Sequence, residues 1–309
     1  KKVTDIKRLI ISHGHQDHDG NVYELLAASG AELWAHELYF LFMPYERSRT
    51  GLNTESILHN SILSIRNNAG YSGAQATNEH SRWIERYQTY ATTRLQAIKE
   101  NFKTHSIVHD EKFGDLRFLH TPGHAIDEIC IDLKGVLFTG DHILPQITPH
   151  PTLIRTYPPE IMGDIPEKHR QPSEHYGLHC YIKSLATVLQ MDRRKTVMPA
   201  HRLFNDNKCN IRNLMRAKDI INHHARRLSS IVNAVIEGAN TPAKITMSLF
   251  PPRKLTGSGF FAALSEMVSH LEMLENIGDI KVLHDGSITS NGTRSFVGEI
   301  NNMLQNQIV

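Results

Sequence analysis

The sequence has few cysteines, almost no net charge and no long apolar run. Its 309 residues include three cysteines, Cys130, Cys180 and Cys209, which are scattered and form no CxxC pair. Such cysteines are typical of buried thiols in a reducing compartment, so we expect a cytoplasmic protein without a disulfide framework. The net charge of +2, from 34 basic and 32 acidic residues, requires neither nucleic acid nor an anionic membrane as a partner.

Apolar runs long enough to cross a membrane are also absent, and we expect no signal peptide. With 40% hydrophobic and 21% charged residues, the composition is that of a globular protein. A chain of this length can form one large domain or two ordinary ones. These features argue against a membrane-spanning, disordered or disulfide-stapled protein. They leave the oligomeric state open, a homo-oligomer included.

Histidine, by contrast, is abundant, and four metal-type ligands lie within six residues near the start of the chain. They are His13, His15, Asp17 and His18, in the string HGHQDH. Imidazole nitrogens and carboxylate oxygens are good ligands for zinc and similar divalent ions. A loop leaving the apolar strand predicted at 9–11 can direct them toward two ions, and Gly14 leaves the backbone free to turn. Because 20 residues of the chain are histidine, a solvated histidine-rich loop is the alternative.

The first 207 residues alternate predicted strands and helices, which is typical of an α/β domain. Strands are predicted at 9–11, 31–35, 116–120, 129–133, 135–139 and 196–199, and helices at 21–30 and 175–190. Residues 36–110 interrupt this pattern with polar helical stretches broken at 70–73. They predict an inserted helical hairpin that either covers the sheet or forms a lid beside the substrate. Residues 143–172 contain many prolines and are predicted to form an irregular loop.

Residues 208–309 show a different pattern and are predicted to form a second, small domain. Helices are predicted at 221–238, 241–250 and 260–278, of which the first and third end at a glycine. A β-hairpin is predicted at 280–290, with its turn at Asp285-Gly286. Three helices followed by a hairpin predict a winged-helix-like module.

Three later turns each add one metal-type ligand directly after a predicted strand. His124 lies in TPGH at 121–124, Asp141 in TGDH at 139–142 and His201 in MPAH at 198–201. In open α/β sheets, functional sites gather at strand ends in this way. Each turn alone is a weak signal, but four ligand-bearing turns in succession favour a metal site over a chance cluster.

These motifs resemble those of the metallo-β-lactamase superfamily, in its glyoxalase II-like hydrolase branch. The matching strings are HGHQDH at 13–18, PGH at 122–124, GD at 140–141 and AH at 200–201, in the family order over about residues 8–202. The resemblance implies an α/β (α+β) fold, the αββα sandwich, with a two-metal site at one edge. Family members have several strands before the first motif, so we expect that N-terminal strands are missing here. The helical tail resembles the winged-helix domain that some members carry.

The resemblance also implies the ligand set. His13, His15 and His124 would hold the first metal. Asp17, His18 and His201 would hold the second, and Asp141 would bridge both. Two divalent ions, zinc by default with iron or manganese as alternatives, can share a water and lower its pKa toward neutrality. The resulting metal-bound hydroxide would cleave an ester, thioester or lactone-type bond of a small molecule, with Asp17 as the partner for the nucleophile's proton.

Residues near these ligands are expected to have supporting roles. Ser12 and Asp19 either orient the imidazoles or cap the following helix. His142 is expected to pack or to donate a hydrogen bond to a ligand rather than to contact substrate. Most of the histidines in or after the proline-rich loop are expected at the surface, with one or two lining the pocket: His150, His169, His175 and His179. Arg155 and Tyr157 are candidates for anion or carbonyl recognition.

Three other functions are compatible with parts of the sequence. An endoribonuclease-like, metal-dependent nuclease would bind nucleic acid through the winged helix, and Arg226-Arg227 and a pI of about 8.4 allow this. The near-equal basic and acidic counts, however, give no electrostatic footprint for nucleic acid. Two-iron redox members of the superfamily usually carry a carboxylate where His15 stands and a flavin domain, and this chain shows neither. A non-catalytic binding module is disfavoured because all seven ligands are present.

Overall fold

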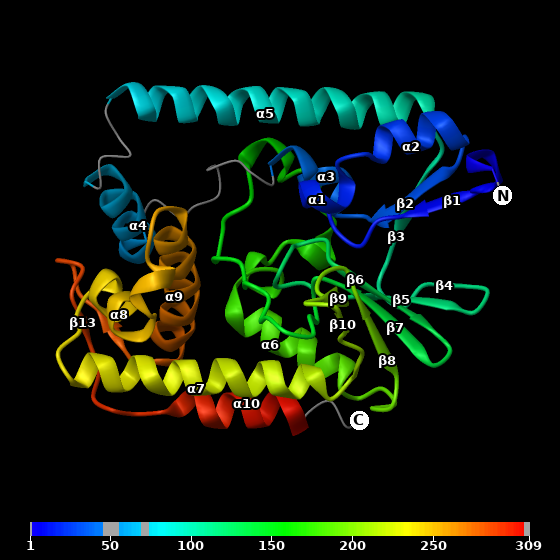
Figure 1. Ribbon diagram of the computed structural model, residues 1–309. Helices are drawn as coiled ribbons and strands as arrows, with labels where there is room; N and C mark the ends of the chain where they lie inside the picture. Colours follow the sequence, from blue (N-terminus) through cyan, green and yellow to red (C-terminus); the bar gives the residue numbers. More distant parts are fainter. Residues whose placement is uncertain (1, 46–55, 69–73, 306–309) are drawn as a thin grey trace.

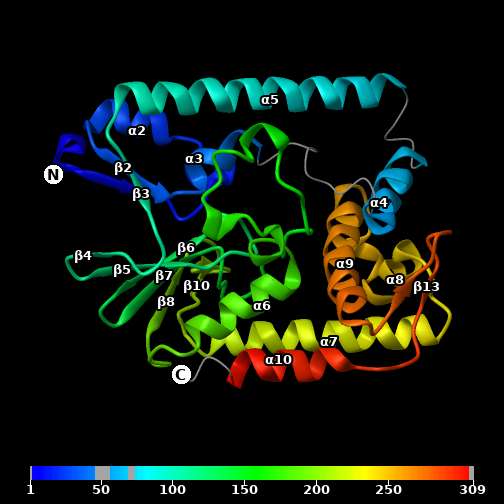
Figure 2. The same cartoon turned by 180° about the vertical axis from the view of Figure 1, so that it is seen from behind.

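Two β-sheets face each other, and helices cover both outer faces (Figures 1 and 2). The computed structural model describes residues 2–45, 56–68 and 74–305. The first sheet consists of three parallel strands in the order β1-β2-β3: β1 (Arg8–Ile10), β2 (Glu32–His36) and β3 (Thr104–Ile107). The parallel pairing requires crossover segments between the strands, and these contain helices.

The second sheet has six strands within the described residues, in the order β11-β8-β7-β6-β5-β4. Its strands are β4 (Lys112–Phe113), β5 (Leu116–His120), β6 (Ile129–Leu133), β7 (Val136–Gly140), β8 (Thr196–Pro199) and β11 (Arg212–Asn213). Only β7 and β8 pair in parallel, and the other neighbours in this sheet are antiparallel. A short hairpin of β9 (Phe204–Asn205) and β10 (Lys208–Cys209) precedes β11.

The inner faces of the two sheets meet in a small aromatic and aliphatic core. Trp34 and Ile107 from the first sheet pack with Phe118 and Ile129 from the second, and each is almost completely buried. Side chains that alternate along a strand place every second residue on the same face, so each sheet contributes one face to this layer. The core therefore fixes the distance between the sheets at whose edge the predicted ligands lie.

Helices form the two outer layers of the αββα sandwich. The first sheet is covered by α2 (Val22–Ser29), which ends at Gly30 as predicted, and by the second half of α5 (Ala74–Asn101). Ala91, Leu95 and Ile98 make one buried face of α5, at the spacing of an amphipathic helix. Two short helices, α1 (Gln16–Asp19) and α3 (Tyr39–Phe42), flank this sheet, and α6 (Gly177–Val188) covers the second.

The segment predicted as a helical insertion at 36–110 contains α4 (Ile57–Asn68) and α5, but it also contains β3. The prediction was wrong for residues 104–107, because this short stretch pairs with β2 as an edge strand of the first sheet. The break predicted at 70–73 lies outside the described residues. In Figures 1 and 2, α5 runs along one side of the molecule, from α4 beside the C-terminal helices to the first sheet. An ion pair between His59 and Glu272 attaches α4 to α9.

The C-terminal region contains the three predicted helices, the hairpin and one further helix. These elements are α7 (Arg216–Ile236), α8 (Pro242–Leu249), α9 (Ser258–Ile277), β12 (Lys281–Val282), β13 (Ile288–Thr289) and α10 (Ser295–Gln305). Thr241 caps α8, since its side chain accepts a hydrogen bond from the Lys244 amide at 3.3 Å. The α10 helix was not predicted; the Asp279 carboxylate accepts hydrogen bonds from its first two amides, Ser295 and Phe296.

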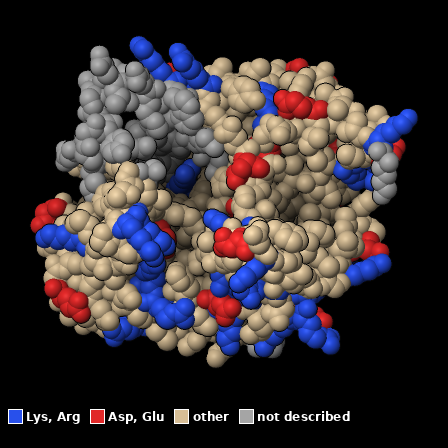
Figure 3. Space-filling view, in the orientation of Figure 1, with Lys and Arg blue, Asp and Glu red and all other residues tan. Residues whose placement is uncertain are grey.

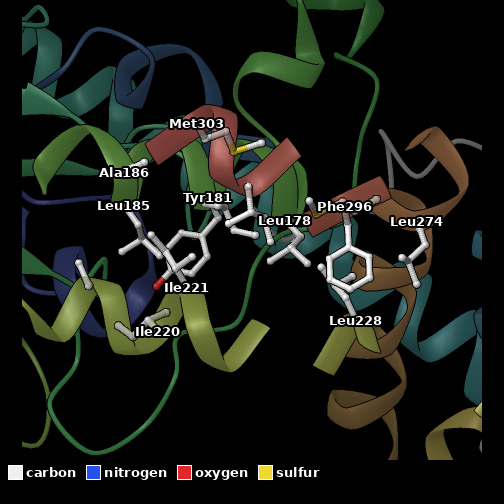
Figure 4. Packing of buried hydrophobic residues seen from close by; sticks show 14 of the residues in the cluster. Leu178, Tyr181, Leu185, Ala186, Ile220, Ile221, Leu228, Leu274, Phe296 and Met303 are labelled. Atoms are coloured by element: carbon white, nitrogen blue, oxygen red, sulfur yellow. The ribbon is translucent and has the colours of Figure 1, made fainter. Parts of the chain in front are cut away.

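The C-terminal helices share one continuous apolar core with α6. Figure 4 shows Tyr181 and Leu185 of α6 next to α7, and Phe296 of α10 between α7 and Leu274 of α9. Burial of this continuous surface holds the C-terminal helices against the second sheet. The winged-helix description and the domain boundary at 207–208 stay predictions.

Two further sequence predictions concern the loops and the cysteines. The proline-rich segment after β7 is largely irregular, with three short 3₁₀ turns, η3 (Pro159–Ile161), η4 (Glu167–His169) and η5 (Pro172–Glu174). Cys130 and Cys180 are buried as expected, but Cys209 is exposed, because its two-residue strand belongs to a surface hairpin. Among the described residues, no helix has both the length and the apolar character that crossing a membrane requires.

Candidate metal centre

All seven predicted ligands lie on turns that follow strands at one edge of the sandwich. The loop after β1 carries His13 and His15, and α1 carries Asp17 and His18. The turns after β5, β7 and β8 carry His124, Asp141 and His201. Two backbone hydrogen bonds hold these turns together. The Ile129 amide donates to the Ser12 carbonyl at 2.8 Å and so joins the two sheets. The Ala200 amide donates to the Gly140 carbonyl at 2.9 Å.

Three histidines form the first group of ligands. Donor atoms of His13, His15 and His124 lie within 4.8 Å of one another. His13 Nε2 is 2.9 Å from His15 Nδ1, and the rings of His15 and His124 meet edge to face with centroids 4.8 Å apart. The structure therefore brings together the three residues that the sequence assigned to the first metal.

The second group comprises Asp17, His18 and His201, whose donor atoms also lie within 4.8 Å of one another. Asp17 Oδ2 is 3.2 Å from His201 Nε2 and 3.6 Å from His18 Nε2. The Asp17 side chain is 63% exposed and that of His201 is 40% exposed, so this side of the centre opens to solvent. The group again matches the sequence assignment.

Asp141 lies between the two groups. Its Oδ2 atom is 3.6 Å from His124 Nε2, 3.5 Å from His18 Nε2 and 3.4 Å from His201 Nε2. Burial raises the pKa of this carboxyl, but the hydrogen bond from His18 and the nearby imidazoles outweigh burial and hold the pKa below its ordinary value. One ionised carboxylate thus faces histidines of both groups, which is the position that a bridging ligand needs.

Hydrogen bonds on the far side of the rings set which nitrogen can bind a metal. His124 Nδ1 donates to the His150 carbonyl at 2.9 Å, so the lone pair of His124 lies on Nε2, toward Asp141. His13 Nδ1 lies 3.1 Å from Ser12 Oγ and 3.4 Å from Glu128 Oε1, which directs His13 Nε2 toward His15. Metal-ligating histidines are commonly oriented by such partners.

Glu128 is a supporting residue that the sequence prediction missed. Its side chain is completely buried behind the ligands, and Oε1 accepts a hydrogen bond from the Asp141 amide at 3.0 Å. Burial, and then the nearby Asp141 charge, raise the pKa of this carboxyl well above its ordinary value. Glu128 therefore positions both His13 and Asp141. The available signal was an acidic pair, Asp127-Glu128, directly before the apolar strand β6.

Two glycines allow the ligand turns to pack this closely. Gly123 has φ +126°, and a Cβ atom on it would collide with the backbone of Tyr181 in α6. Gly140 has φ +49°, and a Cβ atom there would collide with the Glu128 carboxylate and Ser12. Both positions lie in the left-handed region, so glycine is required by conformation as well as by space.

The donor set fits divalent metal ions. His124 Nε2 and Asp141 Oδ1 are buried polar atoms with no hydrogen-bond partner, although buried polar groups are normally paired. Burial lowers the pKa of His124 to about 4 and that of His13 well below its ordinary value, which keeps both imidazoles neutral near pH 7. Neutral imidazoles and ionised carboxylates are the protonation states in which these groups bind metals.

Four residues that the sequence placed near the ligands support the centre or the packing around it. Ser12 contacts His13 as expected. Asp19 is buried and accepts hydrogen bonds from Tyr39 and Arg94, so it anchors α1 to α3 and α5. His142 is completely buried and packs against the Tyr181 ring, as the packing alternative requires. His150 contributes its backbone carbonyl to His124.

The expectation of surface positions was wrong for His169 and His175, and the recognition role was wrong for Tyr157. His169 and His175 are 6% and 4% exposed and belong to a separate histidine cluster. Tyr157 is buried, and its hydroxyl donates to the His169 carbonyl at 2.8 Å, so it is not available to a substrate. The prolines fold this loop back onto the protein. His179 is exposed as expected, and Arg155 is half-buried.

A family model described as the metallo-beta-lactamase superfamily matches residues 1–195, more than half of the chain. The chain therefore belongs to the metallo-beta-lactamase superfamily, whose members are mostly hydrolases that bind divalent metals. The prediction of a metallo-β-lactamase-fold hydrolase is confirmed at this level. The glyoxalase II-like branch stays a prediction. No curated protein matches the chain significantly.

Two solved structures are similar to this fold. A metallo-beta-lactamase family protein from Thermus thermophilus has a TM-score of 0.58 at 19% identity, over 94% of this chain and 81% of that one. A beta-lactamase domain protein from Burkholderia ambifaria has a TM-score of 0.63 at 20% identity, over 92% of this chain and 75% of that one. At these identities, the likeness shows a shared fold.

Proposed function

We propose that the protein is a dinuclear metallohydrolase that cleaves an ester, thioester or lactone-type bond of a small molecule. The observation that carries the proposal is the position of Asp141, whose Oδ2 atom lies within 3.6 Å of histidines from both ligand groups. His13, His15 and His124 would hold one ion, Asp17, His18 and His201 the other, and Asp141 both. Zinc is the ion that we favour for this His/Asp donor set, with iron and manganese as alternatives.

Two divalent ions, when bound, supply an activated water for attack and an electrophile that polarises the scissile carbonyl. The chain's own residues fix the geometry for this chemistry. Glu128 holds the backbone of Asp141 and the ring of His13, and the His150 carbonyl holds His124. Glu128 and Asp141 lie next to the ends of β6 and β7, where the backbone is already paired, which favours a fixed geometry.

Asp17 is suited to accept the proton of the nucleophile. Its side chain is 63% exposed at the rim of the centre, and its Oδ2 faces His201 at 3.2 Å. A carboxylate that is held at the rim can accept a proton from a group at the centre and then release it to solvent. We therefore assign Asp17 the role of proton acceptor in addition to that of ligand.

A mainly basic cavity, joined to the centre by one loop, supports a substrate with an anionic group. The cavity has a volume of about 540 Å³, and four basic residues line it together with two acidic ones: Arg216, Arg226, Arg227 and Lys254, with Asp219 and Glu266. The segment between Asp141 and His150 connects it to the centre, because residues 146–148 line the cavity and the His150 carbonyl contacts His124. Guanidinium groups bind carboxylates and phosphates well. Basic and acidic side chains are interspersed over the face in Figure 3.

The test is a hydrolysis panel on the full chain loaded with Zn²⁺, Mn²⁺ or Fe²⁺. The panel contains thioesters, lactones, carboxylic esters, β-lactams, phosphodiesters and RNA. We expect turnover of a carbonyl substrate, lost in Asp141→Ala. Arg226→Ala should raise KM for substrates that carry a carboxylate or phosphate, whereas Arg193→Ala, an exposed arginine elsewhere, should not. Cleavage of RNA or phosphodiesters without any carbonyl hydrolysis would replace this proposal with the nuclease alternative.

A further inference from the structure

A second cluster of histidines lies outside the centre described above. Donor atoms of His120, His169 and His175 lie within 4.8 Å of one another. His120 is the last residue of β5, His169 ends η4, and His175 directly follows η5. Three segments separated in the sequence thus meet at one point. We call these three residues the outer cluster.

Hydrogen bonds on two rings of the outer cluster determine which nitrogen is free to bind a metal. His120 Nε2 donates to the Ile126 carbonyl at 2.8 Å, which leaves the lone pair on Nδ1. His169 Nε2 is 2.9 Å from Glu37 Oε1 and donates to it, which leaves the lone pair of His169 on Nδ1. His169 Nδ1 in turn lies 3.2 Å from His175 Nε2. The His169–Glu37 pair has the form in which a carboxylate orients a metal-binding imidazole.

We propose that His120, His169 and His175 bind a third divalent metal ion of the zinc class, separate from the two-metal centre. Nitrogen ligands at 2.0–2.1 Å from a tetrahedral ion lie about 3.3 Å from one another, close to the spacing of His169 and His175. Three histidines with a fourth position open to water form a known kind of zinc site. Of the three residues, His120 is half-buried, whereas His169 and His175 are buried.

A hydrogen-bonded network without metal explains less of this geometry. Two facing lone pairs at 3.2 Å repel, so either a proton or a cation must lie between His169 Nδ1 and His175 Nε2. A proton satisfies that pair alone. His120 takes no part in that pair, although one of its ring nitrogens lies within 4.8 Å of a nitrogen of each, whereas a cation can interact with all three residues.

The surroundings fix the orientation of the outer cluster. The His36 ring stacks on His120 with centroids 3.8 Å apart and an interplanar angle of 17°. Lys168 Nζ lies 2.5 Å from Glu37 Oε1, the same oxygen that pairs with His169, so this carboxylate is held by both residues.

The position of the outer cluster indicates a structural role. Glu37 follows β2 of the first sheet, His120 ends β5 of the second sheet, and the other two histidines belong to the proline-rich loop. An ion there would join both sheets to a loop that has little regular structure of its own. Binding of an ion to the folded state alone stabilises that state and raises its melting temperature.

The experiment measures metal stoichiometry in the full chain. The protein is stripped with a chelator and titrated with Zn²⁺, and bound metal is counted by mass spectrometry. Wild type should bind three ions. His169→Gln and His175→Gln should each bind two and keep at least half of the wild-type turnover. His179→Gln removes an exposed histidine from α6, one turn beyond His175, and should still bind three. A wild-type count of two, or unchanged counts in folded His169→Gln and His175→Gln, would overturn the proposal.

A second measurement covers the case in which these variants do not fold. Asp141→Ala damages the central site but leaves the outer cluster intact. Its melting temperature should rise on addition of Zn²⁺, and Co²⁺ bound to it should show the intense visible absorption of a tetrahedral site. Where Asp141→Ala combined with His175→Gln also folds, it should bind one Co²⁺ fewer than Asp141→Ala alone, because an ion held by His13, His15 and His124 would remain. Absence of both signals in folded Asp141→Ala would also overturn the third site.

Discussion

The two histidine clusters use the same ring chemistry but differ in charge and in access. The central ligands include the carboxylates Asp17 and Asp141, and Asp17 is exposed at the rim. The outer cluster has imidazoles alone as inward-facing groups, and its single carboxylate, Glu37, lies behind His169. Two adjacent dications repel strongly unless anionic ligands lie between them, whereas one dication does not need such a ligand. The comparison indicates that carboxylate ligands, more than histidines, distinguish a reactive two-metal centre from a structural one-metal site.

The largest effect should follow from removing the charge between the two ligand groups. Asp141→Asn keeps the shape of the side chain but not the charge that faces His18, His124 and His201. We expect fewer than two ions at the central site and a loss of turnover of at least about a hundredfold, because losing even a partner of a ligand costs roughly 10- to 100-fold. Metal analysis and kcat measurement check this. Asp192→Asn, at an exposed turn, is the control, and unchanged metal content in Asp141→Asn would contradict the bridging role.

The next effect concerns the buried carboxyl that supports the central site. Glu128→Ala removes the acceptor of the Asp141 amide and the neighbour of His13, so metal affinity at the centre should fall by about 10- to 100-fold. Glu128→Gln keeps an acceptor oxygen and should remain within a few-fold of wild type. Zinc affinities from competition with a chelating dye separate the two variants. Equal zinc affinities in Glu128→Ala and wild type would show that the contacts of Glu128 with His13 and Asp141 do not determine metal binding at the central site.

The central site could be predicted from the sequence because its ligands lie in short strings next to strand ends. A motif such as HGHQDH fixes both ligand type and local spacing, and the strands on either side fix the direction of the turn. Helix ends were also predictable from single residues, as Gly30 and Thr241 show. In both cases the determining interaction lies within a few residues along the chain.

The remaining features depend on contacts between distant segments, which local patterns do not encode. The outer cluster joins His120 to His169, far apart along the chain, and nothing in the residues beside either one indicates that contact. Glu128 acts through the Asp141 amide, 13 residues away. The β3 strand has four residues and follows a 28-residue helix, so its pairing with β2 is decided by the fold. The expectation that His169 and His175 lie at the surface failed for the same reason.

Among the described residues, the buried pair His224 and His270 has no carboxylate partner and no third ligand. It therefore provides a comparison in which buried imidazoles affect stability without binding a metal. His224 Nδ1 and His270 Nε2 are 3.0 Å apart between α7 and α9, and burial lowers the pKa of His270 to about 3. The unfolded chain binds the extra proton below pH 6.5 and the folded chain does not. The free energy of unfolding is therefore not reduced by this histidine above pH 6.5, and it falls as the pH decreases from 6.5 toward 3. At pH 5 this histidine should destabilise the metal-free fold by about 2 kcal/mol.

Urea unfolding of metal-free protein at pH 7.5 and pH 5 measures this loss. His270→Gln should lose less stability between the two pH values than wild type, because one buried titrating ring is gone. Saturating Zn²⁺ should leave the difference between the two proteins unchanged, since a pair of imidazoles makes a poor site by itself. If His270→Gln and wild type lost the same free energy on acidification, the pair would not contribute to acid sensitivity.

The smallest effect should come from the hydrogen bond that holds the loop of the outer cluster. Tyr157→Phe removes the donor to the His169 carbonyl while keeping the buried ring, so the free energy of unfolding should fall by about 1 kcal/mol. Zinc affinity of the outer cluster should weaken a few-fold, because His169 becomes less fixed. Turnover should not change, since no central ligand contacts this loop position. Tyr90→Phe, exposed on α5, is the control; reduced turnover in Tyr157→Phe with intact metal content would mean that the two clusters are coupled rather than separate.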